Sequence, residues 1–107
     1  MPSKFSLQYT ASFDEDLSNI YKYIAHNLQN PEAASEQVDR IMLATTSIAL
    51  FPKAYRVRGN NRYGKEVRFF PVDNYVIIYS VDDANYIVNI LRVLYGRRNM
   101  NYFFSLD

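Results

Sequence analysis

The chain has 107 residues, no cysteine and one histidine, and its 12 Lys/Arg and 11 Asp/Glu give a formal net charge of +1. This length suits one domain over residues 1–107, which can bury roughly two thirds of its unfolded surface without a metal or a disulfide. The lack of cysteine excludes thiolate catalysis and cysteine zinc sites, and no apolar run reaches the ~20 residues that cross a bilayer, so we expect a cytoplasmic protein without a membrane partner.

The charge is distributed unevenly along the chain. Residues 1–52 carry three Lys/Arg and six Asp/Glu, whereas residues 53–107 carry nine and five. Between residues 53 and 68, Glu66 is the only acid, and the basic residues are Lys53, Arg56, Arg58, Arg62, Lys65 and Arg68. Such a block favours a polyanion or an acidic protein partner, and equally a solvated loop.

The N-terminal part predicts a strand followed by an amphipathic helix. A half-buried strand over residues 4–10 is indicated by apolar residues at alternate positions, namely Phe5, Leu7 and Tyr9. Ser12 and Glu15 have the spacing of a capping box, which makes Ser12 the expected N-cap. A helix over residues 13–28 follows from apolar residues at helical spacing, namely Phe13, Leu17, Ile20, Tyr21, Ile24 and Leu28. His26 falls off this stripe, so we expect it to be solvated.

A second helix is predicted to start at Asn30 and Pro31, a cap and a first-turn proline, and to stop at Phe51-Pro52. Its apolar stripe consists of Ala34, Val38, Ile41, Thr45 and Ile48. Because the connection is short, the two helices should form an antiparallel hairpin that packs on a shared sheet.

The C-terminal half predicts a basic loop and three strands. Residues 53–64 are polar and contain Gly59-Asn60-Asn61, which indicates a mobile loop. Strands are predicted over residues 65–72, 75–81 and 86–95, with turns short enough for antiparallel hairpins. The two adjacent acids of the second turn, Asp82 and Asp83, are expected to be turn residues, with no metal site.

The predicted fold class is therefore α+β: an N-terminal strand, an antiparallel helix hairpin and a three-stranded antiparallel meander. The helices should cover one sheet face and leave the opposite face, with Val76, Ile78 and Ser80, available for function. Tyr75 and Tyr79 should belong to the core. The chain has no glycine-rich phosphate loop, so we expect no nucleotide cofactor.

The segment from Arg92 to Asn99 turns a predicted strand into a cluster of arginines. Arg92 lies on the same parity as Val88 and Ile90, so a half-buried structural ion pair is the favoured role for it. Arg97 and Arg98 follow the pivot Gly96, and their guanidinium groups are suited to phosphates and carboxylates. A structural alternative is that these two arginines pair with acids such as Asp82 or Asp107.

Several linked motifs resemble the RelE/ParE superfamily, the toxins of type II toxin–antitoxin modules that are also called plasmid-stabilisation proteins. They extend in order over nearly the whole chain: Tyr9-Thr10, Asp16-Leu17, Ile20-Tyr-Lys-Tyr-Ile24, Asn30-Pro-Glu-Ala-Ala34, Phe51-Pro52, Arg68-Phe-Phe-Pro-Val-Asp-Asn-Tyr75, Ile77-Ile-Tyr79, Val81-Asp-Asp83 and Ile90-Leu-Arg-Val-Leu-Tyr-Gly-Arg-Arg98. Members usually have histidine at the position of Tyr95 and glycine at that of Asp73.

The superfamily holds two mechanisms on one fold, so the resemblance alone does not decide the chemistry. Members that cleave messenger RNA on the ribosome use basic residues on the meander strands, and here Val67, Phe69 and Val76 stand at those places. For an endoribonuclease, the resemblance implies Arg68, Tyr95 and Arg98 as catalytic candidates, without an evident general base.

The ending Leu94-Tyr-Gly-Arg-Arg-Asn99 is more similar to the branch that poisons DNA gyrase by binding. This is the favoured interpretation, with a toxin–antitoxin hetero-oligomer as the inactive form. The expected binding residues are Arg62, Lys65, Arg97, Arg98 and Asn99. An endoribonuclease acting on messenger RNA at the ribosome is the alternative, and a degenerate member that only binds its antitoxin is a third hypothesis. The antitoxin should carry an acidic or amphipathic segment that folds onto this chain.

Overall fold

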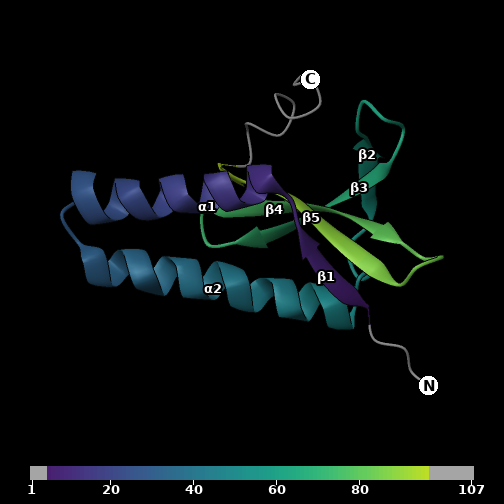
Figure 1. Ribbon diagram of the computed structural model, residues 1–107, viewed down its shortest axis with the longest axis horizontal. Coiled ribbons are helices and arrows are strands. Elements are labelled where there is room, and N and C mark those ends of the chain that lie inside the picture. Colours follow the sequence, from purple (N-terminus) through teal and green to yellow (C-terminus); the bar gives the residue numbers. More distant parts are fainter. Residues whose placement is uncertain (1–4, 97–107) are drawn as a thin grey trace.

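The computed structural model describes residues 5–96, which form an α+β fold with two main helices packed on a five-stranded mixed sheet (Figure 1). The elements are β1 (Ser6–Tyr9), α1 (Ala11–Lys22), the π-helical turn η1 (Tyr23–Asn27), α2 (Pro31–Leu50), β2 (Val57–Asn60), β3 (Glu66–Val72), β4 (Tyr75–Asp82) and β5 (Ile87–Tyr95). The predicted fold class and the order of its elements are confirmed. No helix in this part of the chain combines the length and the hydropathy that spanning a membrane requires.

The sheet order is β1-β5-β4-β3-β2, so the first strand of the chain lies beside the last. β1 pairs with β5 in parallel, with Ser6 opposite Ile87 and Tyr9 opposite Ile90, and every other pairing is antiparallel. β4 lies in the middle of the sheet, and its residues 75–80 are all buried. This burial on both faces explains why β4 has a nearly continuous apolar sequence.

The main core lies between the helices and one face of the sheet. Phe13, Ile41 and Ile48 from the helices pack against sheet residues, namely Tyr75, Ile77, Tyr79, Val88, Ile90 and Val93. The prediction that Tyr75 and Tyr79 are core residues is confirmed. Burial raises the pKa of Tyr79 to about 12, and its hydroxyl donates a hydrogen bond to the carbonyl of Pro52 at 2.9 Å.

The opposite sheet face differs from the prediction of an open, functional surface. It carries a second apolar cluster formed by Val67, Phe69, Val76 and Ile78, all of which are buried. Ser80 on the same face is only 6% exposed. The apolar residues at both parities of β4 already favour two packed faces over one packed and one solvated face.

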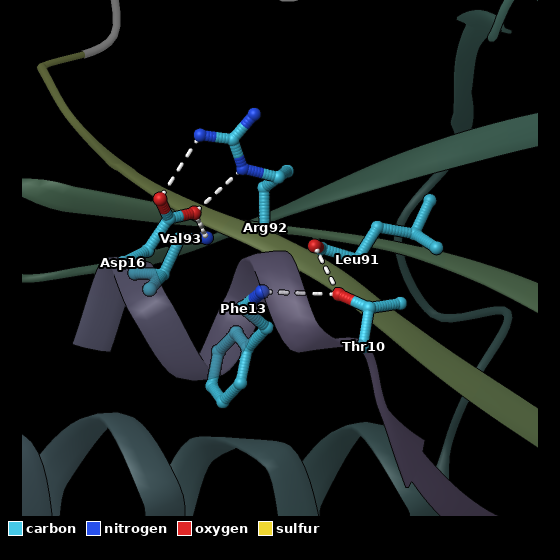
Figure 2. Close-up of polar contacts among 6 residues, drawn as sticks. All are labelled: Thr10, Phe13, Asp16, Leu91, Arg92 and Val93. Carbon is cyan, nitrogen blue, oxygen red and sulfur yellow. Dashed lines mark hydrogen bonds and ion pairs between the residues drawn. The ribbon is translucent and has the colours of Figure 1, made fainter. Parts of the chain in front are cut away.

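The start of α1 is fixed by Thr10 and not by Ser12 as predicted. The Thr10 hydroxyl accepts a hydrogen bond from the Phe13 amide at 3.0 Å and donates one to the carbonyl of Leu91 at 2.7 Å (Figure 2). Because β1 ends at Tyr9, Thr10 lies both at the N-terminus of α1 and next to β5. The helix therefore begins two residues earlier than its apolar stripe indicates.

The second contact between α1 and β5 is the ion pair of Asp16 with Arg92 (Figure 2), which confirms the predicted structural role of Arg92. The predicted parity is wrong, because Leu91 is an extra residue in a β-bulge between Ile90, opposite Tyr79, and Arg92, opposite Ile78. After the bulge, the next β5 residue on the buried face is therefore Val93 and not Arg92. The Arg92 side chain is directed toward the N-terminal half of α1.

The helix hairpin follows the predicted signals. The Asn30 side chain caps α2 by accepting a hydrogen bond from the Ala33 amide at 3.1 Å, and Pro31 occupies the first turn. Within the stripe, Gln37 is buried and Val38 is only half-buried, so Gln37 was missed by a purely apolar pattern. Its amide is satisfied by a hydrogen bond to Asp73 at 2.9 Å.

Residues 53–64 are not the continuous loop that the sequence indicates. Val57–Asn60 forms the edge strand β2, which pairs with β3 through an irregular register at Gly59. A four-residue strand with the sequence Val-Arg-Gly-Asn lacks the apolar alternation by which strands are recognised. The meander therefore has one strand more than predicted.

Candidate functional site

Three of the predicted binding residues, Arg97, Arg98 and Asn99, lie outside the described residues. Arg98 was also a catalytic candidate for the endoribonuclease. The structure places the other candidates in three locations: Arg68 within β3, Tyr95 at the end of β5, and Arg62 with Lys65 at the tip of the β2–β3 hairpin. His26 is exposed on η1, as predicted.

Arg68 is half-buried on β3 and faces Tyr79 on β4. One terminal nitrogen of its guanidinium donates a hydrogen bond to the carbonyl of Tyr55, which lies in the segment between α2 and β2. This contact ties that segment to the sheet. Arg68 therefore has a structural partner in addition to any ligand.

Tyr95 ends β5 opposite Tyr75, the first residue of β4. The two rings meet edge to face with centroids 5.4 Å apart, and Tyr95 remains 61% exposed. Just beyond them, the Gly96 amide donates a hydrogen bond to the carbonyl of Asn74 at 2.8 Å. Burial is the main cause that raises the pKa of Tyr75 above its ordinary value, and the neighbouring Tyr95 adds to it.

The structure does not bring Arg68 and Tyr95 together. Their partners on β4, Tyr79 and Tyr75, are four residues apart, and β3 and β5 lie on either side of β4. The two backbones are thus separated by about 13 Å along the strands and about 10 Å across them. Arg68 and Tyr95 therefore do not form a preassembled pair, and one guanidinium nitrogen of Arg68 is already engaged by the Tyr55 carbonyl.

A groove of about 660 Å³ opens beside Tyr95, where the helix hairpin extends past the start of β4. We call it the hairpin groove; its lining residues are Asn19, Ile20, Tyr23, Ile24, Leu28, Ala33, Gln37, Arg40, Asn74, Tyr75 and Tyr95. Tyr23 and Leu28 are more than half exposed, at 54% and 56%. Leu28 belongs to the predicted apolar stripe, and an apolar stripe that runs past the sheet is the signal by which the groove could have been found.

The polar rim of the hairpin groove is built around Asp73. Its carboxylate accepts hydrogen bonds from Arg40 at 2.8 Å and from Gln37 at 2.9 Å, so it connects α2 to the β3–β4 turn. The hydrogen bond from Arg40 is the main cause that holds the pKa of Asp73 below its ordinary value, and the one from Gln37 adds to it. Asp73 has a positive φ of 55°, a conformation in which aspartate is tolerated better than most residues with a side chain.

Arg62 and Lys65 lie on a second surface, which we call the basic hairpin and define as residues 56–68. Its exposed cations are Arg56, Arg58, Arg62 and Lys65. The guanidinium of Arg58 stacks over the Phe69 ring at 4.8 Å, and that of Arg62 stacks over the Tyr63 ring at 4.9 Å. Of the other basic residues in the block, Lys53 forms an ion pair with Asp83 at 2.8 Å.

No group of three or more His, Asp or Glu side chains suited to a metal ion occurs within residues 5–96. Asp82 accepts hydrogen bonds from the Asn85 side chain at 2.9 Å and the Asn85 backbone at 3.2 Å, as expected of a turn residue. These bonds lower the pKa of Asp82. Both predicted turn acids thus have contacts within the fold.

A protein-family match covers nearly all of the helices and strands described above. The family described as "ParE toxin of type II toxin-antitoxin system, parDE" matches residues 7–100. No curated protein matches the sequence.

Three solved structures share the fold. A chain of the chromosomal ParDE toxin–antitoxin system from P. aeruginosa is 21% identical, with a TM-score of 0.68 over 88% of this chain and 98% of that one. A chain of the RelBE2 toxin–antitoxin complex from Mycobacterium tuberculosis is 17% identical, with a TM-score of 0.59 over 87% and 99%. One from the archaeal RelE–RelB complex of Pyrococcus horikoshii is 15% identical, with a TM-score of 0.60 over 90% and 99%.

Proposed function

The chain belongs to the ParE toxin family of type II toxin–antitoxin systems, and from this premise we propose that it arrests growth by poisoning DNA gyrase until a cognate antitoxin neutralises it. The single observation that carries the proposal is the match to the ParE family over residues 7–100. A gyrase poison acts by binding, so it needs exposed contact groups and no assembled catalytic set.

The placement of the predicted catalytic residues supports a binding mechanism over RNA cleavage. Cleavage through the 2′-hydroxyl requires a base, an acid and a cation around one phosphate. Arg68 and Tyr95 stand at opposite ends of the β4 core residues, and Arg68 is engaged by the Tyr55 carbonyl. The ribonuclease hypothesis is therefore the weaker of the two for these residues.

We infer that the antitoxin docks in the hairpin groove. The sheet face that was expected to be available for function is buried, whereas Tyr23, Leu28 and Tyr95 leave apolar surface exposed around the groove. An amphipathic helix could lay its apolar side chains there, and an acidic residue on it could approach Arg40. Finding a neighbouring reading frame that encodes a small DNA-binding protein with such a segment would support this assignment.

The test of the gyrase proposal is induced expression of the full chain in bacterial cells. We expect DNA breaks and filamentous cells while protein synthesis continues at first. Rapid loss of translation with messages cut in the ribosomal A site contradicts the proposal and favours the endoribonuclease. Unaffected growth, with the chain folded and present, favours a degenerate antitoxin-binding member.

The role of the C-terminal arginines has its own test. The double variant Arg97→Glu/Arg98→Glu is expected to lose toxicity, because reversed charge repels phosphates and acidic groups of a gyrase–DNA complex. Lys22→Glu, on the exposed surface of α1, is the matched control and should remain toxic. A fully toxic double variant contradicts the role assigned to Arg97 and Arg98, provided circular dichroism shows both variants folded.

A further inference from the structure

We propose that the basic hairpin is a binding site for the phosphodiester backbone of single-stranded nucleic acid, with Tyr63 at its tip as the platform for one unstacked base. This surface is separate from the hairpin groove, and the proposal does not depend on whether the cellular target is gyrase. Figure 1 shows the β2–β3 hairpin projecting away from the helices at the far edge of the sheet.

The first argument is charge. Arg56, Arg58, Arg62 and Lys65 are exposed within ten residues, and Glu66 is the only acid of the basic hairpin. Asp82 is close enough to Lys65 for the lysine to contribute to its lowered pKa, so one end of the hairpin has an acid nearby. The basic hairpin still contains five basic residues and one acid, and a polyanion is complementary to that composition.

The second argument is the arrangement of rings and cations. Arg58 stacks on Phe69 and Arg62 on Tyr63, which engages the flat faces of the guanidinium groups. Stacking leaves N–H groups at the edges of the Arg58 guanidinium able to donate to phosphate oxygens. In Arg62, one terminal nitrogen already donates a hydrogen bond to the Tyr63 hydroxyl at 2.8 Å, which holds the ring and the cation together. Tyr63 is 74% exposed although Arg62 covers part of its ring, so a base can stack on the remaining ring surface.

The third argument is that hydrogen bonds fold the tip into a defined turn. The Asn61 side-chain oxygen accepts hydrogen bonds from the amides of Tyr63, at 2.9 Å, and Lys65, at 3.0 Å. The Asn61 amide donates to the Lys65 carbonyl at 2.8 Å, and Gly64 supplies the positive φ of 79° that closes the turn. Tyr63 is thereby positioned before any ligand arrives, which lowers the entropy cost of binding.

These features favour nucleic acid over an acidic protein. Cations and an exposed ring within a few residues match a chain in which phosphates and bases alternate. A protein interface instead needs a broad contact area of about 800 Å² on each partner, which a two-stranded tip does not offer. A single strand is preferred over a duplex because paired bases present no free face to Tyr63.

The experiment is fluorescence anisotropy with the full chain and labelled 15-nucleotide oligo-dT and oligo-U. Both should bind, with log K falling against log salt by about 0.7 per phosphate contact, or about 2.1 if Arg56, Arg58 and Lys65 engage. Tyr63→Ala should weaken binding roughly 5-fold or more without changing the salt slope. The double variant Arg58→Gln/Lys65→Gln should reduce the slope by about 1.4. Lys22→Gln on α1 is the control and should bind like the wild type.

Equal affinity for oligo-dT and oligo-U identifies the shared backbone and base stacking as the recognised features. A preference for oligo-U adds a 2′-hydroxyl contact to the same site. The proposal is overturned if poly-glutamate of similar charge competes as well as oligo-dT does, if a duplex binds more tightly than either single strand, or if Tyr63→Ala binds both strands like the wild type. Circular dichroism of each variant separates lost contacts from lost folding.

Discussion

The carboxylate of Asp16 on α1 receives the guanidinium of Arg92 on β5 through two hydrogen bonds of 2.7 and 2.9 Å. The same carboxylate accepts the Val93 amide at 3.1 Å. β1 ends at Tyr9, so within residues 5–96 the edge of β5 beyond Ile90 has no strand partner on that side. Side chains supply some of the missing hydrogen bonds on this edge. Asp16 bonds to the Val93 amide, and Thr10 bonds to the Leu91 carbonyl.

The Asp16 contact leads to a prediction on stability. Asp16→Asn keeps the shape of the side chain but leaves the Arg92 charge poorly paired, and we expect a loss of about 2 kcal/mol in the free energy of unfolding. Urea denaturation at neutral pH measures it. In a double-mutant cycle with Arg92→Leu, the loss caused by Asp16→Asn should shrink, and additive losses contradict a direct interaction.

The N-cap assignment separates two neighbouring hydroxyls. Thr10→Ala removes the cap of α1 and the bond to Leu91, so it should cost about 1–2 kcal/mol. Ser12→Ala should change the unfolding free energy by less than about 0.5 kcal/mol, because Ser12 is an exposed residue inside the helix. Urea denaturation measures both changes. Equal losses of unfolding free energy in the two variants would contradict the Thr10 cap and favour the capping box predicted at Ser12.

Asp73 combines a strained backbone with a favourable side chain. Asp73→Ala and Asp73→Gly both lose the bonds from Gln37 and Arg40, but glycine tolerates the positive φ and alanine does not. We therefore expect the glycine variant to be more stable than the alanine variant by about 1 kcal/mol. Thermal unfolding of the pair decides this, and the reverse order contradicts the backbone argument.

Asp73 also predicts how stability changes at acidic pH. The pKa of Asp73 is lower in the folded chain than its ordinary 3.8, so its contribution is present above that pH and is lost as pH falls through the folded value. Asp82 acts in the same direction. Urea midpoints measured from pH 6 down to about pH 2.5 should decline less steeply in Asp73→Asn than in the wild type. Parallel profiles contradict the assignment.

The hairpin groove makes a prediction on the antitoxin. When the tagged chain is co-expressed with the product of an adjacent reading frame, we expect the two proteins to co-purify. Leu28→Glu should abolish this, because a charge would enter the apolar groove. Leu43→Glu is the control, since Leu43 is 68% exposed on α2 and does not line the groove. Loss of co-purification in both variants points to another docking surface.

Much of the fold could be predicted from local patterns. The strand alternation at Phe5, Leu7 and Tyr9, the cap at Asn30 and the stop at Phe51-Pro52 all act between near neighbours, so a sequence displays them directly. β2 was missed because its pairing with β3 depends on backbone bonds across a hairpin and not on apolar side chains. The burial of the second face was missed although the apolar residues at both parities of β4 favour it.

The candidate site was harder to predict for a physical reason. The groove exists because η1 and the start of α2 extend beyond the sheet, which depends on relative element lengths in three dimensions. The separation of Arg68 from Tyr95 depends on strand register, and the bulge at Leu91 shifts that register without any marker in the sequence. The sequence identified Arg68, Arg62 and Lys65 as candidates by residue type, and the fold then showed which of them lie on the same surface.

The parallel pairing of β1 with β5 sets a time order on synthesis. Ser6 finds its partner only after Ile87 has been added, 81 residues later. At ordinary elongation rates this takes roughly 4 to 16 s. A nascent chain therefore cannot complete its sheet until β5 has been synthesised, and a toxin with this architecture lacks its finished fold until then.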